Sequence, residues 1–352
     1  MKVKRIFLLI SIILVTVFVF TLTIGSLNAE AADKVYRLKI QSAYPRGDLS
    51  MELLKDFAST ADRMSKGRIK IQVFADPELV PAEQLFEATQ KGTLDMLHAV
   101  AAMWGGILPI GEVEFGLPYA YNLPGEPDVF TAGKMIRDLF FNTGFVDLLR
   151  QEYAKQGLYW LDVHSYGPIF TMATEKITTC DDLKGKKIRC EGSWADYYNA
   201  VGARGTYISG MEAYMGLKLG TIDASQWDVS AVTGLNWQEV APYRLLGGQN
   251  DVVVGQILFN QKSWNALPDD LKKVMTAAAE DYFHKLLKIY DVELKKVDEL
   301  VKAGKVINSP IDAACDRQHE EAAYALWDKI GQRDPAAAQA IGIIKDWRKT
   351  LK

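Results

Sequence analysis

The 352-residue sequence predicts an α/β protein whose two lobes face a shared cleft. Three observations support this prediction. Strand-like and helical patterns alternate from residue 36 onward, a short motif from the first half recurs in the second, and one long amphipathic segment follows both copies. Hydrophobic residues make up 49% of the chain and charged residues 24%, which is enough apolar material to fill two cores.

The first residues have the composition of a secretory signal peptide. Three basic residues precede an apolar run over residues 6–24, and Ala29 and Ala31 then fit a small-residue cleavage site. The run is long for a signal peptide, so an uncleaved anchor is the alternative. We expect residues 1–31 to be removed on export, which changes the formal net charge from −3 to about −5. That charge does not favour nucleic acid or an anionic membrane as a partner.

The next elements read as a βαβ unit followed by a further helix and strand. Residues 36–44 alternate as a strand does, and apolar residues over 51–64 recur at helical spacing. Residues 68–74 form the second predicted strand. An amphipathic helix is predicted over 82–92, and the mostly apolar residues 93–100 suit a buried strand.

The same pattern recurs later in the chain. "SKGRIKIQVF" from Ser65 resembles "LKGKKIRCEG" from Leu183, and "QKGTLDM" from Gln90 is echoed by "KLGTIDA" from Lys218. Two lobes of related design would produce this recurrence, while chance similarity between two α/β halves is the alternative. Two such lobes imply a cleft, and ligands of α/β folds bind near the carboxyl ends of strands.

A long helix and a helical C-terminal extension follow. Apolar residues over 271–300 predict one long helix or two abutting ones, about 45 Å long if continuous, that could span both lobes. The extension is rich in alanine and charge, and could pack on a lobe or form a dimer face. The predicted boundaries are 34–158 with about 247–281 for the first lobe, 159–246 with about 282–310 for the second, and 311–352 for the extension.

The cysteines are expected to meet the oxidising conditions outside the cytoplasm. Cys180 and Cys190 flank the stretch "DDLKGKKIR", so a disulfide between them is a candidate that would stiffen the strand ending at Arg189. Two small buried thiols are the alternative. Cys315 is unpaired under either interpretation.

Enzyme signatures are mostly absent from the sequence. The four histidines contain no pair at metal-site spacing, and there is no G-x-S-x-G elbow, P-loop or dinucleotide-binding glycine motif. His284 and His319 lie in charged helical segments and are expected to face solvent. His98 and His164 each lie at or just after a predicted strand and could line the cleft or have a structural role.

A recognition surface is the better-supported prediction. Arg189 ends a predicted strand of the second lobe, where its guanidinium could bind a carboxylate through two parallel hydrogen bonds. Trp227 follows "GTIDASQ", and Trp104 follows the matching motif of the first lobe. One cation and aromatic walls would suit a small organic anion. The alternatives are core packing for each tryptophan and a surface charge for the arginine.

The order of "SKGRIKIQVF", "KGTLDM", "DDLKGKKIR", "GTIDASQW" and "LFNQKSWNALPDDLK" resembles the DctP-like periplasmic solute-binding proteins of tripartite ATP-independent periplasmic (TRAP) transporters. The resemblance covers nearly the whole mature chain and implies a two-lobe periplasmic-binding-protein fold. It assigns the carboxylate clamp to Arg189, a ligand contact to Trp227 and a cleft position to Trp104. Tyr166 or His164 stands near a position that is glutamine in relatives.

The most similar subgroup is dimeric and binds keto or hydroxy acids, with a metal ion bridging to the ligand. The acidic residue that helps to hold this ion is Gln226 here, which removes a charge from the site. Gln226, Asp228 and Asp251 are the candidates for holding a calcium or sodium ion, and Gln249 and Asn250 could also supply oxygens. No cofactor for catalysis is implied.

The resemblance implies a receptor that captures a small organic acid in the periplasm and delivers it to integral-membrane TRAP subunits. Arg189 would anchor the carboxylate, and polar groups near Gln226 and Gln249 would select among acids. The C-terminal extension suggests a homodimer. A ligand-sensing subunit is the alternative, and a secreted hydrolase or lyase on a two-lobe scaffold is a further one. The sequence leaves the identity of the acid open.

Overall fold

The computed structural model describes residues 34–125, 127–248 and 252–351, and residues 37–352 form one compact unit. The predicted signal peptide and the candidate residues Gln249, Asn250 and Asp251 lie outside the described residues. Within the described part of the chain, no helix combines the length and the apolar character needed to cross a membrane.

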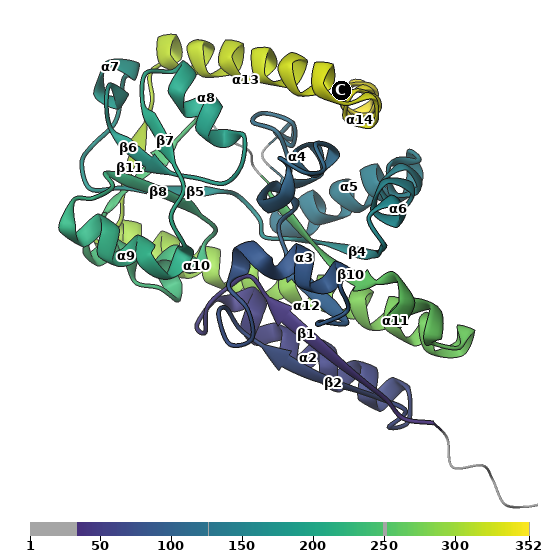
Figure 1. Cartoon of the computed structure of the whole chain (residues 1–352). Coiled ribbons are helices and arrows are strands. Elements are labelled where there is room, and N and C mark those ends of the chain that lie inside the picture. The colour runs from purple at the N-terminus through teal and green to yellow at the C-terminus, as the bar shows by residue number, and fades with distance from the viewer. Residues whose placement is uncertain (1–33, 126, 249–251, 352) are drawn as a thin grey trace, which may run out of the picture. The chain divides into compact units, whose positions relative to one another are not determined.

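The first of two sheets has five strands in the order β2-β1-β3-β10-β4 (Figure 1). β1 runs parallel to β3, and β10 is antiparallel to both β3 and β4. The strands predicted around residues 36–44, 68–74 and 93–100 are confirmed as β1, β2 and β3. Their bounds and those of the later two strands are Tyr36–Ser42 (β1), Ile69–Phe74 (β2), Met96–Ala99 (β3), Leu158–Ser165 (β4) and Val254–Asn260 (β10).

The second sheet has six strands in the order β11-β9-β5-β8-β6-β7. β6 lies between β7 and β8 and is parallel to both, so that Arg189, its last residue, pairs with Thr206 and Ser225. Arg189 therefore lies at the carboxyl end of a parallel group of strands. The bounds are Phe170–Ala173 (β5), Lys187–Arg189 (β6), Arg204–Thr206 (β7), Ala224–Trp227 (β8), Tyr243–Leu246 (β9) and Ile307–Pro310 (β11).

We call each sheet, with the helices packed on it, a lobe: the five-stranded sheet belongs to the first lobe and the six-stranded sheet to the second. The chain passes from the first sheet to the second between β4 and β5, and returns between β9 and β10. The boundary predicted after residue 158 is too early, because all of β4 pairs with β10 in the first sheet. A two-residue alternation cannot by itself tell which sheet a strand joins.

The predicted long helix is confirmed as α12, a continuous helix of 34 residues from Asp269 to Lys302. It packs on α2 (Leu49–Met64), α5 (Val129–Asn142) and β4 of the first lobe and on the short helix α10 (Ser230–Thr233) of the second. β11 follows it and pairs with β9, so α12 carries the chain back to the second lobe.

Several of the other helices begin at side chains that accept the free backbone N–H groups of the first turn. Asp48 accepts from the backbone N–H groups of Ser50 and Met51 at the start of α2, and Thr179 forms a capping box with Asp182 at α7. The helices of the first lobe are α2 (Leu49–Met64), α3 (Leu85–Gln90), α4 (Ile110–Phe115), α5 (Val129–Asn142), α6 (Phe145–Lys155) and α11 (Gln261–Ala266), with 3₁₀ turns at Ala82–Gln84 and Ala101–Trp104. Those of the second are α7 (Cys180–Leu183), α8 (Trp194–Ala200), α9 (Gly210–Leu219) and α10 (Ser230–Thr233), with a 3₁₀ turn at Trp237–Glu239.

The C-terminal extension forms two helices, α13 (Ala313–Arg333) and α14 (Pro335–Thr350), that pack on the body of the protein. α13 packs against α8 of the second lobe, and α14 against α4 and α6 of the first (Figure 1). The indole of Trp327 in α13 is buried and donates to the backbone oxygen of Pro118 in the first lobe. The extension thus contacts both lobes, while the homodimer stays a prediction.

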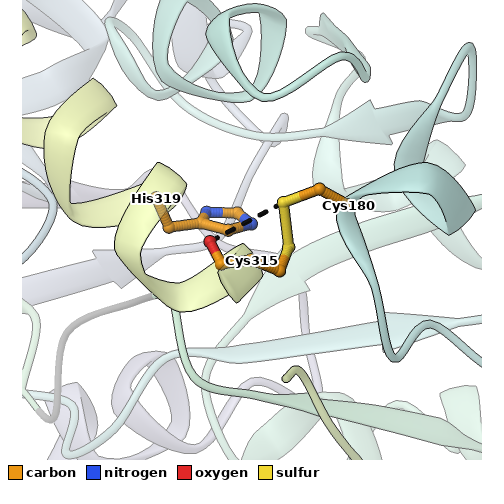
Figure 2. A group of neighbouring side chains, drawn as sticks. All are labelled: Cys180, Cys315 and His319. Atoms are coloured by element: carbon orange, nitrogen blue, oxygen red, sulfur yellow. Dashed lines mark hydrogen bonds between the residues drawn. A yellow bond between two sulfur atoms is a disulfide. The ribbon is translucent and has the colours of Figure 1, made fainter. Parts of the chain in front are cut away.

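Cys180 forms its disulfide with Cys315 and not with Cys190, so the predicted pairing is wrong (Figure 2). Cys180 begins α7 and Cys315 lies in the first turn of α13, 135 residues later. Cys190 is a free, buried thiol directly after β6, and its Sγ contacts the backbone oxygen of Ile188. Nearness along the chain was misleading because α13 packs against the second lobe and brings a distant cysteine to α7.

The expectation that His319 faces solvent is also wrong, whereas His284 is exposed as expected. His319 lies one turn after Cys315 and is fully buried, with its Nδ1 2.6 Å from the hydroxyl of Tyr197. Figure 2 shows its ring beside the Cys180–Cys315 bridge. Since both sulfurs are bonded to each other, these cysteines are not available as thiolate ligands for a metal.

Candidate ligand-binding site

A small cavity of about 60 Å³ lies among residues of both lobes. A single water needs roughly 10–15 Å³, so the cavity has room for about four to six non-hydrogen atoms. Several of its lining residues lie at or just after the carboxyl ends of β1, β3, β4, β6 and β8, where α/β folds bind ligands. The lining residues are Tyr44, Val100, Phe115, Tyr166, Ile169, Arg189, Glu191, Gln226, Trp227, Asp228 and Val253.

Arg189 is 3% exposed and is held by three acceptors of the second lobe. Its Nε donates to the backbone oxygen of Ile208 at 3.0 Å, and its Nη1 donates to the backbone oxygen of Gln226 at 3.2 Å. Its Nη2 forms an ion pair with the carboxylate of Glu191. A guanidinium has five N–H groups, so these bonds leave one N–H on each terminal nitrogen for a ligand.

Glu191 is the main feature of this wall that the sequence prediction missed. Its side chain is 14% exposed, lines the cavity and uses Oε1 for the ion pair with Arg189. The signal was present in the stretch "IRCEG", since residues two apart on an extended segment lie on the same side. The arginine is therefore not a lone positive charge.

Trp227 connects the second lobe to the first. Its Nε1 donates to the hydroxyl of Ser230 at 3.0 Å and to Oδ2 of Asp48, the residue that caps α2, at 3.3 Å. Its ring meets the ring of Tyr44 edge-on, with centroids 5.8 Å apart. The guanidinium carbon of Arg189 lies 5.0 Å from the centroid of Trp227, close enough for a cation–π interaction.

Asp228 lies behind this wall in a dense set of hydrogen bonds. Its Oδ1 accepts from the backbone N–H of Ser230 at 2.7 Å, and its Oδ2 accepts from the hydroxyl of Tyr290 on α12. Burial, and then the nearby Asp48 carboxylate, raise the pKa of Asp228 to about 7. Burial also raises the pKa of Asp48.

The structure brings two of the three predicted metal candidates, Gln226 and Asp228, to the cavity wall. Both oxygens of Asp228 already accept hydrogen bonds, and Nε2 of Gln226 donates to the hydroxyl of Tyr198 at 3.0 Å. The amide oxygen of Gln226 and Oε2 of Glu191 are two further oxygens of the lining residues that could help to hold a calcium or sodium ion.

Of the two candidates Tyr166 and His164, Tyr166 lines the cavity and His164 lies behind it. The Tyr166 hydroxyl is 2.6 Å from Nε2 of His164 and donates to the hydroxyl of Tyr44 at 3.0 Å. The ring of His164 stacks on that of His98, with centroids 4.6 Å apart. Burial lowers the pKa of His98 to about 3 and also lowers the pKa of His164. Both imidazoles are therefore neutral near pH 7 and hold the tyrosine in place.

Trp104 does not reach the cavity. It stacks on Phe86 at a centroid distance of 4.9 Å and donates through Nε1 to the hydroxyl of Tyr153 at 3.0 Å. That hydroxyl in turn donates to the buried Glu114. Trp104 is therefore a residue of the first-lobe core, which was the alternative to a position in the cleft. Tyr44, Phe115 and Val100 provide first-lobe walls that the sequence prediction did not name.

Comparison with known proteins places these features in context. Residues 41–334 match the model of the family described as bacterial extracellular solute-binding protein, family 7. A monocarboxylate 2-oxoacid-binding periplasmic protein of Nostoc sp. is 22% identical over 322 residues, 90% of this chain and 85% of the relative. An ectoine-binding periplasmic protein of Halomonas elongata is 26% identical over 241 residues, 66% of this chain and 67% of the relative.

Solved structures share the fold. A TRAP periplasmic solute-binding protein from Pseudoalteromonas atlantica, with bound sodium and pyruvate, superposes with a TM-score of 0.82 at 21% identity, covering 90% of this chain and 95% of that one. One from Colwellia psychrerythraea, with bound calcium and pyruvate, has a TM-score of 0.82 at 22% identity, with the same coverage of 90% and 95%. The two-lobe arrangement and the long helix are features of this fold.

Proposed function

Because the chain belongs to bacterial extracellular solute-binding protein family 7, we propose that it binds a small organic acid between its two lobes and delivers it to the membrane subunits of a TRAP transporter. Relatives are named for binding a monocarboxylate 2-oxoacid, ectoine and 2,3-diketo-L-gulonate. These relatives are periplasmic receptors, so the proposed place of action is the periplasm, with residues 1–31 as the export signal, and the proposed role involves no chemical reaction.

The observation that carries the proposal is the way in which the fold holds the Arg189 side chain at the cavity wall. Its guanidinium is buried at the wall of a small cavity, held by two backbone oxygens, and keeps one N–H on each terminal nitrogen. A carboxylate that accepts both N–H groups would replace water in a site of low dielectric constant, where charge-assisted hydrogen bonds are strong. The pocket size suits acids with few non-hydrogen atoms.

Contacts between the lobes explain how binding would be signalled to a transporter. The hydroxyl of Tyr207 in the second lobe donates to Glu83 of the first at 3.0 Å, and Trp227 donates to Asp48. A ligand that touches walls from both lobes adds to these contacts and favours the closed arrangement. The membrane subunits would then recognise a surface that exists when the lobes are closed.

The test is a thermal-shift screen of the mature protein against small carboxylates, followed by calorimetry. A ligand at 100 times its dissociation constant should stabilise the fold by about 2.7 kcal/mol. Arg189→Lys keeps the charge but loses the planar pair of donors, so we expect weaker binding. Arg204→Ala removes an exposed arginine from the neighbouring strand and serves as the matched control.

The proposal fails if no carboxylate stabilises the protein. It also fails if Arg189→Lys and Arg204→Ala bind the best acid as tightly as the unmodified protein does. Circular dichroism of each variant separates a lost binding site from a lost fold.

A further inference from the structure

We propose that the ligand is a small zwitterion, a carboxylate that also carries an ammonium group, and that Glu191 selects for the positive group. This inference rests on the proposed function and narrows the class of acid that the site accepts. The observation behind it is the buried pair formed by Arg189 and Glu191 within the cavity wall.

The charge of the cavity wall argues against a simple anion. Among the described residues that line the cavity, Arg189 is the one basic side chain, while Glu191 and Asp228 are acidic. The guanidinium and the Glu191 carboxylate cancel each other, and Asp228 adds negative charge when ionised. A ligand carrying a carboxylate alone would approach Arg189 against the field of Glu191, in a site where charges are poorly screened.

A positive group on the same ligand removes this conflict. The ligand carboxylate would accept the two remaining N–H groups of Arg189, and its cationic group would lie near Oε2 of Glu191, the oxygen not used in the Arg189 pair. Four charges of alternating sign would then be paired in the buried site. Neither protein side chain would be left buried and uncompensated, which is the condition that makes a buried ion pair favourable.

The other walls fit a cation as well. Four aromatic side chains line the cavity, and their faces and hydroxyls attract ammonium groups through cation–π and dipolar contacts. Arg189 itself already lies over the ring of Trp227. These aromatic residues are Tyr44, Phe115, Tyr166 and Trp227.

Calorimetry with isosteric pairs of ligands tests the inference, because each pair differs in charge and not in shape. β-Alanine and butyrate form one pair, and glycine and propionate form the other, so that every ligand is small enough for the cavity. With a chelator present, we expect at least one zwitterion to bind about tenfold or more tightly than the simple acid of the same shape, which carries the carboxylate charge alone. Glu191→Gln should remove most of this preference by weakening the zwitterion and strengthening the simple acid.

Glu175→Gln is the matched control, since Glu175 lies in the second lobe and is exposed in an ion pair with Lys186. It removes the same charge from the protein and should leave the preference unchanged. If it reduces the preference as much as Glu191→Gln does, net charge and not the cavity determines selection, and the inference is overturned.

Three further outcomes would overturn the inference. First, the simple acid could bind as tightly as its zwitterionic isostere in the presence of the chelator; this result would leave the proposed function intact. The simple acid could require added calcium or sodium, which would make a metal ion the positive partner of Glu191. Finally, all four ligands could fail to bind. If other carboxylates then bind in an Arg189-dependent way, the proposed function stands without this inference. If no carboxylate binds, the proposed function and the inference both fail.

Discussion

Breaking the Cys180–Cys315 disulfide should lower the stability of the protein by several kcal/mol. The bond closes a loop with a sequence separation of 135 residues. In the chain-entropy description, such a loop restricts the unfolded state by roughly 5 kcal/mol, while measured values are more often about 2–4 kcal/mol. With about 320 folded residues at about 2.1 cal/mol/K each, the entropy of unfolding is near 0.7 kcal/mol/K, so a loss of 3–5 kcal/mol corresponds to about 4–7 °C in Tm.

Thermal melts of Cys315→Ser, with and without a reducing agent, measure this loss. The variant should melt lower than the unmodified protein in oxidising buffer and should not respond to the reductant. Cys190→Ala is the control that distinguishes the two pairings, because Cys190 is a free thiol and its removal should leave the reductant sensitivity intact. The reasoning is refuted if Cys190→Ala abolishes that sensitivity, or if peptide mapping finds Cys180 bonded to Cys190.

Three further changes test the interior. Burial raises the pKa of Glu114 from 4.5 to about 7, so the folded state keeps a proton that the unfolded chain releases. The free energy of unfolding should therefore fall by about 3 kcal/mol as the pH rises from 4.5 to 7. Urea unfolding at a series of pH values measures this fall, and Glu114→Gln should reduce it. Gly255→Ala places a Cβ 2.6 Å from the hydroxyl oxygen of Tyr166, so it should cost about 1–3 kcal/mol in melts and weaken ligand binding in calorimetry. Trp327→Ala removes a buried ring and its bond to the Pro118 oxygen, and should cost about 3–5 kcal/mol in urea unfolding, with Trp327→Phe losing less.

Much of the local structure could be predicted because it depends on local patterns. The βαβ opening, the strand ending at Arg189 and the long helix each follow from periodicity and from turn residues next to them. The position of Arg189 at a cavity wall followed from the rule that ligands of α/β folds bind at the carboxyl ends of strands. Trp227 and Tyr166 reach the same cavity because they also lie at or just after the carboxyl ends of strands.

The features that could not be predicted depend on contacts between distant segments. Cys315 reaches Cys180 because α13 packs on the second lobe, and no local pattern reports that packing. His319 is buried by the same packing, although its own helix is rich in charge. Trp104 follows the repeated motif as Trp227 does, but it turns into the first-lobe core toward Tyr153.

The free-energy cost of burying the Arg189 guanidinium is compensated by the protein's own acceptors and does not have to be met by a ligand. Arg189 ends β6, the strand between β7 and β8, and the backbone oxygens of Ile208 and Gln226 and the carboxylate of Glu191 fix its guanidinium before any ligand arrives. Its desolvation is therefore compensated within the fold, and little side-chain entropy remains to be lost on binding. The same compensation means that a bare carboxylate gains less from the arginine than it would from an unpaired one. Such a site gains specificity from the negative charge of Glu191. Selectivity among acids should therefore depend on Glu191, even where affinity depends on Arg189.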